Sequence, residues 1–161
     1  MKLPRRLAAL AVLPLAVSLA GCAPAVVMET GPDAASTACA EVSVRLPDTV
    51  AGLPSRETDA QATGAWGDPA GVFLTCGVPV PGPSEATCIE VAGVDWLRDA
   101  SNELLTVFTT YGRDPAISVG IDAVNVSGGP ALEDLSSAVS VIEQTSRCLA
   151  RTEAIDTTPN D

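Results

Sequence analysis

The five cysteines of this 161-residue chain carry its most distinctive chemistry, because a thiol can be alkylated or oxidised to a disulfide. Cys22 ends an apolar N-terminal run, and the even set of four that remains is typical of two disulfides in an exported protein. No two cysteines are spaced as Cys-x-x-Cys, which disfavours a thiol-redox enzyme. Of the three possible pairings we favour one that staples two neighbouring strands and ties the ends of the domain together, namely Cys76–Cys88 and Cys39–Cys148.

The first 22 residues have the pattern of a secretory signal that ends in a lipidated cysteine. Three basic residues precede an apolar run over residues 7–20, and small residues then lead directly into Cys22. The sequence Leu19-Ala20-Gly21-Cys22 resembles a bacterial lipobox, in which the cysteine sulfur receives diacylglycerol and the chain is cleaved just before it. The run is shorter than the about 20 residues of a transmembrane helix, and Pro14 interrupts it. We therefore expect Cys22 to become an acylated N-terminus, with chains such as palmitate, on the outer face of the cell membrane.

The rest of the chain lacks most catalytic side chains. Residues 22–161 contain neither His nor Lys, which excludes an imidazole base, a Schiff-base lysine and a histidine metal ligand there. We expect no metal and no cofactor. The first 21 residues hold three of the nine basic residues and no acid, so the remainder has six arginines against 20 acids, a formal charge of −14. That charge repels phosphate backbones, and we expect no nucleic-acid partner.

Aromatic residues are scarce, and several of them lie beside polar or turn residues. Trp66, Asp95, Trp96, Tyr111 and Arg113 form a candidate binding patch, since aromatic residues and arginine dominate binding hot spots. The alternative is that the rings fill a core short of bulky side chains, while Arg113 pairs with a local carboxylate. Burial of the two tryptophans and of Tyr111 without an exposed cluster would remove the patch.

These residues must be positioned by a sheet and a helix. Strand signals recur between residues 71 and 124, and alternation is clearest over Ala116–Val124. Short connections between the strands favour an antiparallel meander. Residues 39–46 alternate like a strand, or Ser36 or Thr37 caps a short helix there. A C-terminal helix opens at Gly128-Gly129-Pro130, and its apolar stripe is Leu132, Leu135, Val139, Ile142 and Leu149.

The expected fold is therefore α+β. An antiparallel meander of about four strands carries the C-terminal helix, and the short N-terminal helix if it forms, on one face, and two disulfides staple the domain. The expected organisation is a signal peptide over residues 1–21, a lipid-anchored flexible tether over 22–38, a single globular domain over 39–151 and a disordered tail over 152–161.

Four blocks of sequence together resemble a known family. They are Trp66-Gly67, Cys76-Gly77-Val78-Pro79, Gly93-Val94-Asp95-Trp96-Leu97 and Thr110-Tyr111-Gly112-Arg113-Asp114-Pro115. Their order and spacing are similar to those of DUF3515, a family of actinobacterial exported proteins of unknown function. The resemblance spans about residues 39–148. It implies a disulfide-bonded domain associated with the cell envelope, and it implies no activity, cofactor or catalytic residue.

Two functions from different classes follow. The first is a non-enzymatic lipoprotein that is held on the membrane through Cys22 and binds an envelope protein or a cell-wall component. The second is a carboxylate-dependent enzyme acting on cell-wall glycan or peptide, which requires two acids that converge in a cleft. We expect the first, because the chain outside the signal lacks catalytic bases and carries no catalytic motif.

Overall fold

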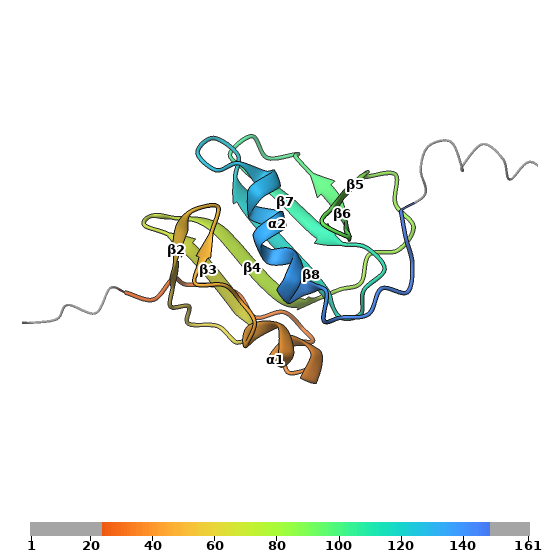
Figure 1. Ribbon diagram of the computed structural model, residues 1–161, viewed down its shortest axis with the longest axis horizontal. Helices are drawn as coiled ribbons and strands as arrows, with labels where there is room; N and C mark the ends of the chain where they lie inside the picture. Colours follow the sequence, from red (N-terminus) through yellow and green to blue (C-terminus); the bar gives the residue numbers. More distant parts are fainter. Residues whose placement is uncertain (1–23, 149–161) are drawn as a thin grey trace, which may run out of the picture.

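Eight strands form one antiparallel sheet in the order β1-β2-β3-β4-β8-β7-β6-β5, with one helix across a face of the sheet and a shorter helix at one end of it (Figure 1). The structure is a computed structural model that describes residues 24–148. Its elements are α1 (Thr37–Ser43), β1 (Thr49–Val50), β2 (Leu53–Arg56), β3 (Thr63–Gly67), β4 (Ala70–Val78), β5 (Thr87–Val91), β6 (Val94–Asp99), β7 (Leu105–Thr110), β8 (Ala116–Asp122) and α2 (Gly128–Val139).

The sheet consists of two four-stranded meanders, β1–β4 and β5–β8, that meet where β4 pairs with β8. The predicted antiparallel sheet and C-terminal helix are confirmed, but the predicted strand number was half of the eight observed. Part of the difference lies within the strand signals predicted between residues 71 and 124, where Ala92 and Gly93, at φ of 48° and 79°, turn the chain and separate β5 from β6. The strands β1–β3 were missed because they are short, are separated by turns and carry no clear alternation of apolar and polar residues.

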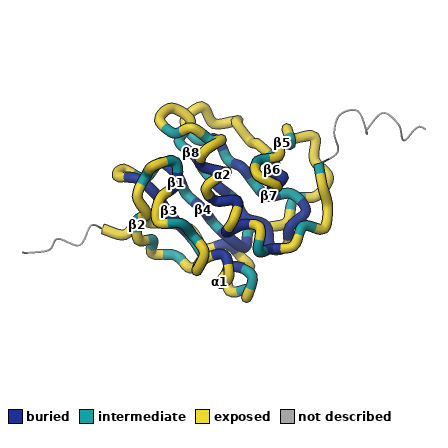
Figure 2. Tube along the Cα trace, in the orientation of Figure 1, coloured by how far each residue is buried: buried dark blue, intermediate teal, exposed yellow. Residues whose placement is uncertain are grey.

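The core lies between the sheet and α2, where buried residues concentrate (Figure 2). Leu132, Leu135 and Val139 form the inner face of α2 and pack in one cluster with the side chains of the central strands. The helix ends at Val139, earlier than its apolar stripe predicted. Ile142 is buried beyond the helix end, and Leu149 lies outside the described residues. The cause is tertiary, because contacts from another turn hold residues 142–148 in a non-helical conformation, as described below.

The segment expected as a flexible tether is packed on the domain where it is described. The Val26 N–H donates to the carbonyl oxygen of Glu57 at 2.8 Å, and Ala34 is buried. Ser36 caps α1 by accepting from the Cys39 N–H, which confirms the short N-terminal helix. The ordered domain therefore begins well before Cys39. Within residues 24–148 no helix is long and apolar enough to span a bilayer.

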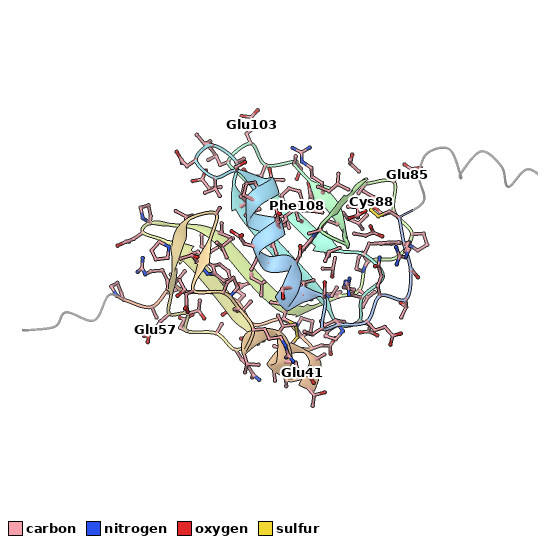
Figure 3. The ribbon with its side chains drawn as sticks, viewed as in Figure 1. Glu41, Glu57, Glu85, Cys88, Glu103 and Phe108 are labelled. Carbon is pink, nitrogen blue, oxygen red and sulfur yellow. A yellow bond between two sulfur atoms is a disulfide. The ribbon has the colours of Figure 1, made fainter. Side chains whose placement is uncertain are left out.

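The two disulfides join Cys39 to Cys76 and Cys88 to Cys148, with Cα–Cα distances of 5.6 and 6.1 Å. All four cysteines are paired as expected, but the favoured pairing Cys76–Cys88 and Cys39–Cys148 was wrong. It assumed that β4 and β5 are neighbours, whereas β8, β7 and β6 lie between them. Four steps of about 4.8 Å place β4 and β5 about 19 Å apart, far beyond the reach of a disulfide. Cys88 lies at the outer edge of the sheet (Figure 3).

Candidate functional site

The five residues predicted as a binding patch do not form one. Trp66 on β3 and Trp96 on β6 are both buried in the core cluster, and β4, β8 and β7 separate their strands. The indole N–H of Trp66 donates to the Pro47 carbonyl oxygen at 2.9 Å. The alternative reading, in which the tryptophan rings fill the core, is therefore correct for both of them.

The other three predicted residues meet on one side of the domain. The Tyr111 N–H donates to the Asp95 carbonyl oxygen at 2.8 Å, and Tyr111 is half-buried. Asp95 is 7% exposed, and its Oδ2 accepts from the Gln144 side chain at 2.8 Å and from the Cys148 N–H at 2.9 Å. Arg113 Nη1 donates to the Ile142 carbonyl oxygen. Asp95 and Arg113 thus hold the segment that follows α2.

The hydrogen bonds of this cluster are made within the domain. Arg113 is only 4% exposed, and burial lowers the pKa of its guanidinium, while the nearby Asp95 charge raises that pKa and Arg147 lowers it. The neighbouring Gly112 carbonyl oxygen accepts from both the N–H and the hydroxyl of Thr145, at 2.6 and 3.0 Å. Buried groups with these partners brace the chain between α2 and the Cys88–Cys148 disulfide, and they leave little free surface for a ligand.

A cleft of about 300 Å³ opens at the opposite end of α2, between its N-terminus and the strands β6–β8. The strand register builds it, because Arg98 is paired with Phe108, and Thr106 with Ile121, so that these side chains share the face that α2 covers. Phe108 belongs to the buried core cluster and lies near the start of α2 (Figure 3). The lining residues are Arg98, Thr106, Phe108, Ile121, Ala123, Val126 and Gly128.

Three kinds of hydrogen-bond donor reach this cleft without a partner among the described residues. Arg98 is exposed and forms no ion pair there, in contrast to Arg56, which pairs with Asp68 at 2.8 Å. Thr106 is 8% exposed, and none of the hydrogen bonds within residues 24–148 involves its hydroxyl. The backbone N–H groups at the start of α2 have no intrahelical acceptor, and the side chain of the N-cap residue Ser127 makes no capping bond.

The loop beside the cleft is fixed by a carboxylate that points into the loop itself. Asp122 accepts from the side chain of Asn125 at 2.8 Å and from the backbone N–H groups of Val124 and Asn125 at 2.9 and 3.1 Å. These bonds, that of the Asn125 side chain first, lower the pKa of Asp122. No acidic residue is among those that line the cleft. Within residues 24–148 no group of three His, Cys, Asp or Glu side chains is placed to hold a metal ion.

Sequence reasoning missed the cleft, although it located the helix start that borders it. A Cβ at Gly128 would make only an ordinary contact, 3.6 Å from Phe108 Cζ, so the cleft does not depend on the small size of this residue. The local sequence around Arg98 and Thr106 carries no sign that the two residues share a cavity. Their proximity follows from the pairing of β6 with β7, which a single sequence does not reveal.

The comparison with known proteins assigns a family. No curated protein and no solved structure matches the chain. A family model described as "Protein of unknown function (DUF3515)" matches residues 6–147, which include every element of the fold. The resemblance found in the four sequence blocks is thus confirmed, and the chain belongs to the DUF3515 family.

Proposed function

We propose that this protein is a lipoprotein anchored through Cys22 on the outer face of the cell membrane, where its domain binds a ligand or partner of the envelope without catalysing a reaction. The observation that carries the binding role is the cleft at the start of α2. It combines an unpaired guanidinium with apolar walls and is lined by no carboxylate. A carboxylate-dependent enzyme would need two converging acids, and nothing in this cleft supports that alternative.

The anchor predicts where the protein is found. Replacing Cys22 by serine removes the sulfur that diacylglycerol would alkylate, so the variant is expected to lose incorporation of labelled palmitate and to leave the membrane fraction. Two acyl chains or more on one residue are needed for stable anchoring, since each buried methylene contributes only about 0.8 kcal/mol. Cys88→Ser is the matched control, because it also replaces one cysteine by serine, and it should keep the label. Full membrane retention of Cys22→Ser without label would contradict the anchor.

The binding role predicts a cross-link at one end of the domain. Val124 is 69% exposed in the loop beside the cleft, and Val44 is 81% exposed at the end of α1. A photo-reactive amino acid at position 124 is expected to give a discrete adduct in intact envelopes. The same amino acid at position 44 should give none, although it is at least as accessible. Equal labelling from both positions, or none from position 124, would count against a partner at the cleft.

A further inference from the structure

We infer that the cleft binds the terminal carboxylate of a peptide that ends in a small apolar residue. This inference rests on the proposed binding role and names the class of ligand. Its starting point is Thr106, whose hydroxyl lies in a residue that is more than nine-tenths buried, lines the cleft and has no hydrogen-bond partner among the described residues. The hydroxyl itself is not among the enclosed unpartnered atoms of the domain, so it is accessible and can donate to an acceptor atom of a ligand in the cleft.

The other polar groups of the cleft favour a negative charge. Gly128 is the first residue of α2, a helix of 12 residues, and the N–H groups of Gly128 and Gly129 carry the positive end of its dipole. Arg98 supplies a full positive charge and a planar pair of donors, which match the two oxygens of a carboxylate. The groups that line the cleft therefore offer donors and no acidic acceptor, as an anion requires.

The charge balance selects a carboxylate over a phosphate. One guanidinium and the about half a charge of one helix terminus offset a single negative charge and fall short of two. A phosphate dianion would bring twice that charge to a domain whose sequence after the signal has a formal charge of −14. The repulsion grows with the charge of the ligand, and one arginine does not offset it.

The side chains that form the walls of the cleft favour an apolar group next to the carboxylate of the ligand. Phe108, Ile121, Ala123 and Val126 are apolar, so the group next to the charge should be apolar as well. A volume of about 300 Å³ is at the small end of ligand sites, which suits one or two small residues rather than a long side chain. Leu104 is 70% exposed and lies next to the cleft, because its carbonyl oxygen accepts from the N–H of the lining residue Ala123 at 3.0 Å. Val124, which follows Ala123, is the second exposed apolar residue at this rim. The chain of the peptide would leave the cleft over this rim.

The test is a titration of the full lipidated protein in detergent micelles, followed by the amide resonances of Gly128 and Gly129. The probe is N-acetyl-Ala-Ala, and its C-terminal amide is the matched ligand without a charge. The acid is expected to shift both resonances with a Kd that is roughly millimolar, given its size, while Gly82, in an open loop, stays unshifted. The amide form should bind at least about tenfold more weakly.

Two variants assign the donors. Arg98→Gln and Thr106→Val are each expected to weaken binding of the acid about tenfold. Thr106→Val keeps the shape of a buried side chain, and an unchanged spectrum elsewhere shows that it folds. Arg45→Gln, at an exposed arginine beyond the end of α1, is the control and should bind as the original protein does.

Each other outcome overturns the inference. Equal affinity for the acid and the amide would show that the cleft does not recognise the negative charge of the peptide terminus. Inorganic phosphate that binds as tightly as the peptide and with the same dependence on Arg98 would show a simple anion site. No shift with any probe would exclude this ligand class, yet an adduct from position 124 would still support the proposed binding role. If neither the resonance shifts nor the adduct from position 124 is observed, the proposed binding role is wrong.

Discussion

Replacing Gly112 by alanine is expected to lower the free energy of unfolding by about 3 kcal/mol or more. Gly112 has φ of +71°, and a Cβ there would lie 1.9 Å from the carbonyl oxygen of Ser146. The backbone of residues 142–148 must therefore move away, and the bond from the Thr145 N–H to the Gly112 carbonyl oxygen is lost with it. Urea unfolding followed by the fluorescence of the two buried tryptophans measures the change.

Gly93→Ala separates the steric effect from the backbone effect. Gly93 has a similar φ of +79°, but a Cβ there meets nothing within 4 Å. This control should cost only the about 1 to 2 kcal/mol of a left-handed conformation in a residue with a side chain. If both variants lost the same stability, the close approach of Ser146 to Gly112 would have no energetic weight, and the structural role given to this turn would be wrong.

Removing the Cys39–Cys76 disulfide is expected to destabilise the protein more than removing Cys88–Cys148, although it closes the shorter loop. The separations of 37 and 60 residues give about 4 kcal/mol each by loop-closure entropy, slightly more for the longer one. Cys39 and Cys76 are both fully buried, so replacing them by alanine also leaves a cavity in the core. Cys88 and Cys148 are half-buried and leave none of comparable size. The urea midpoints of the two double-alanine variants test this order.

The same difference in burial predicts which bond is reduced first. Under native conditions a water-soluble phosphine should open Cys88–Cys148 while Cys39–Cys76 stays intact until the domain unfolds, because attack on a sulfur requires access. Alkylation and mass spectrometry after partial reduction identify the opened pair. Early labelling of Cys39 and Cys76 in the folded protein would show that this part of the core opens far more easily than its burial implies.

Local features of the fold could be predicted because their signals lie in short stretches of sequence. The start of α2 at Gly128, the stripe that begins at Leu132 and the alternation through β8 all follow from residues within a few positions of one another. The short helix capped by Ser36 was one of two predicted alternatives for the same reason. The four sequence blocks were enough to indicate the family, since their order along the chain is itself a sequence property.

The candidate site could not be predicted, because it depends on which strands are neighbours. Arg98 and Thr106 meet only through the pairing of β6 with β7 and the placement of α2 above them. The predicted patch failed for the related reason that an aromatic ring beside a turn has no sequence mark that separates surface from core. Trp66 and Trp96 are equally buried on distant strands.

The sequence by itself determined the local periodicity, the helix caps, the even set of four cysteines and the family. Only the tertiary structure decided the strand order, the cysteine pairing, the end of α2 and the cleft. The physical reason is the distance along the sequence between the residues that interact. A helix or a strand is encoded by neighbouring residues, whereas residues 79–86 can span up to about 26 Å and thus let the chain cross from the centre of the sheet to its edge. That crossing separates β5 from β4, which rules out a bond between Cys76 and Cys88.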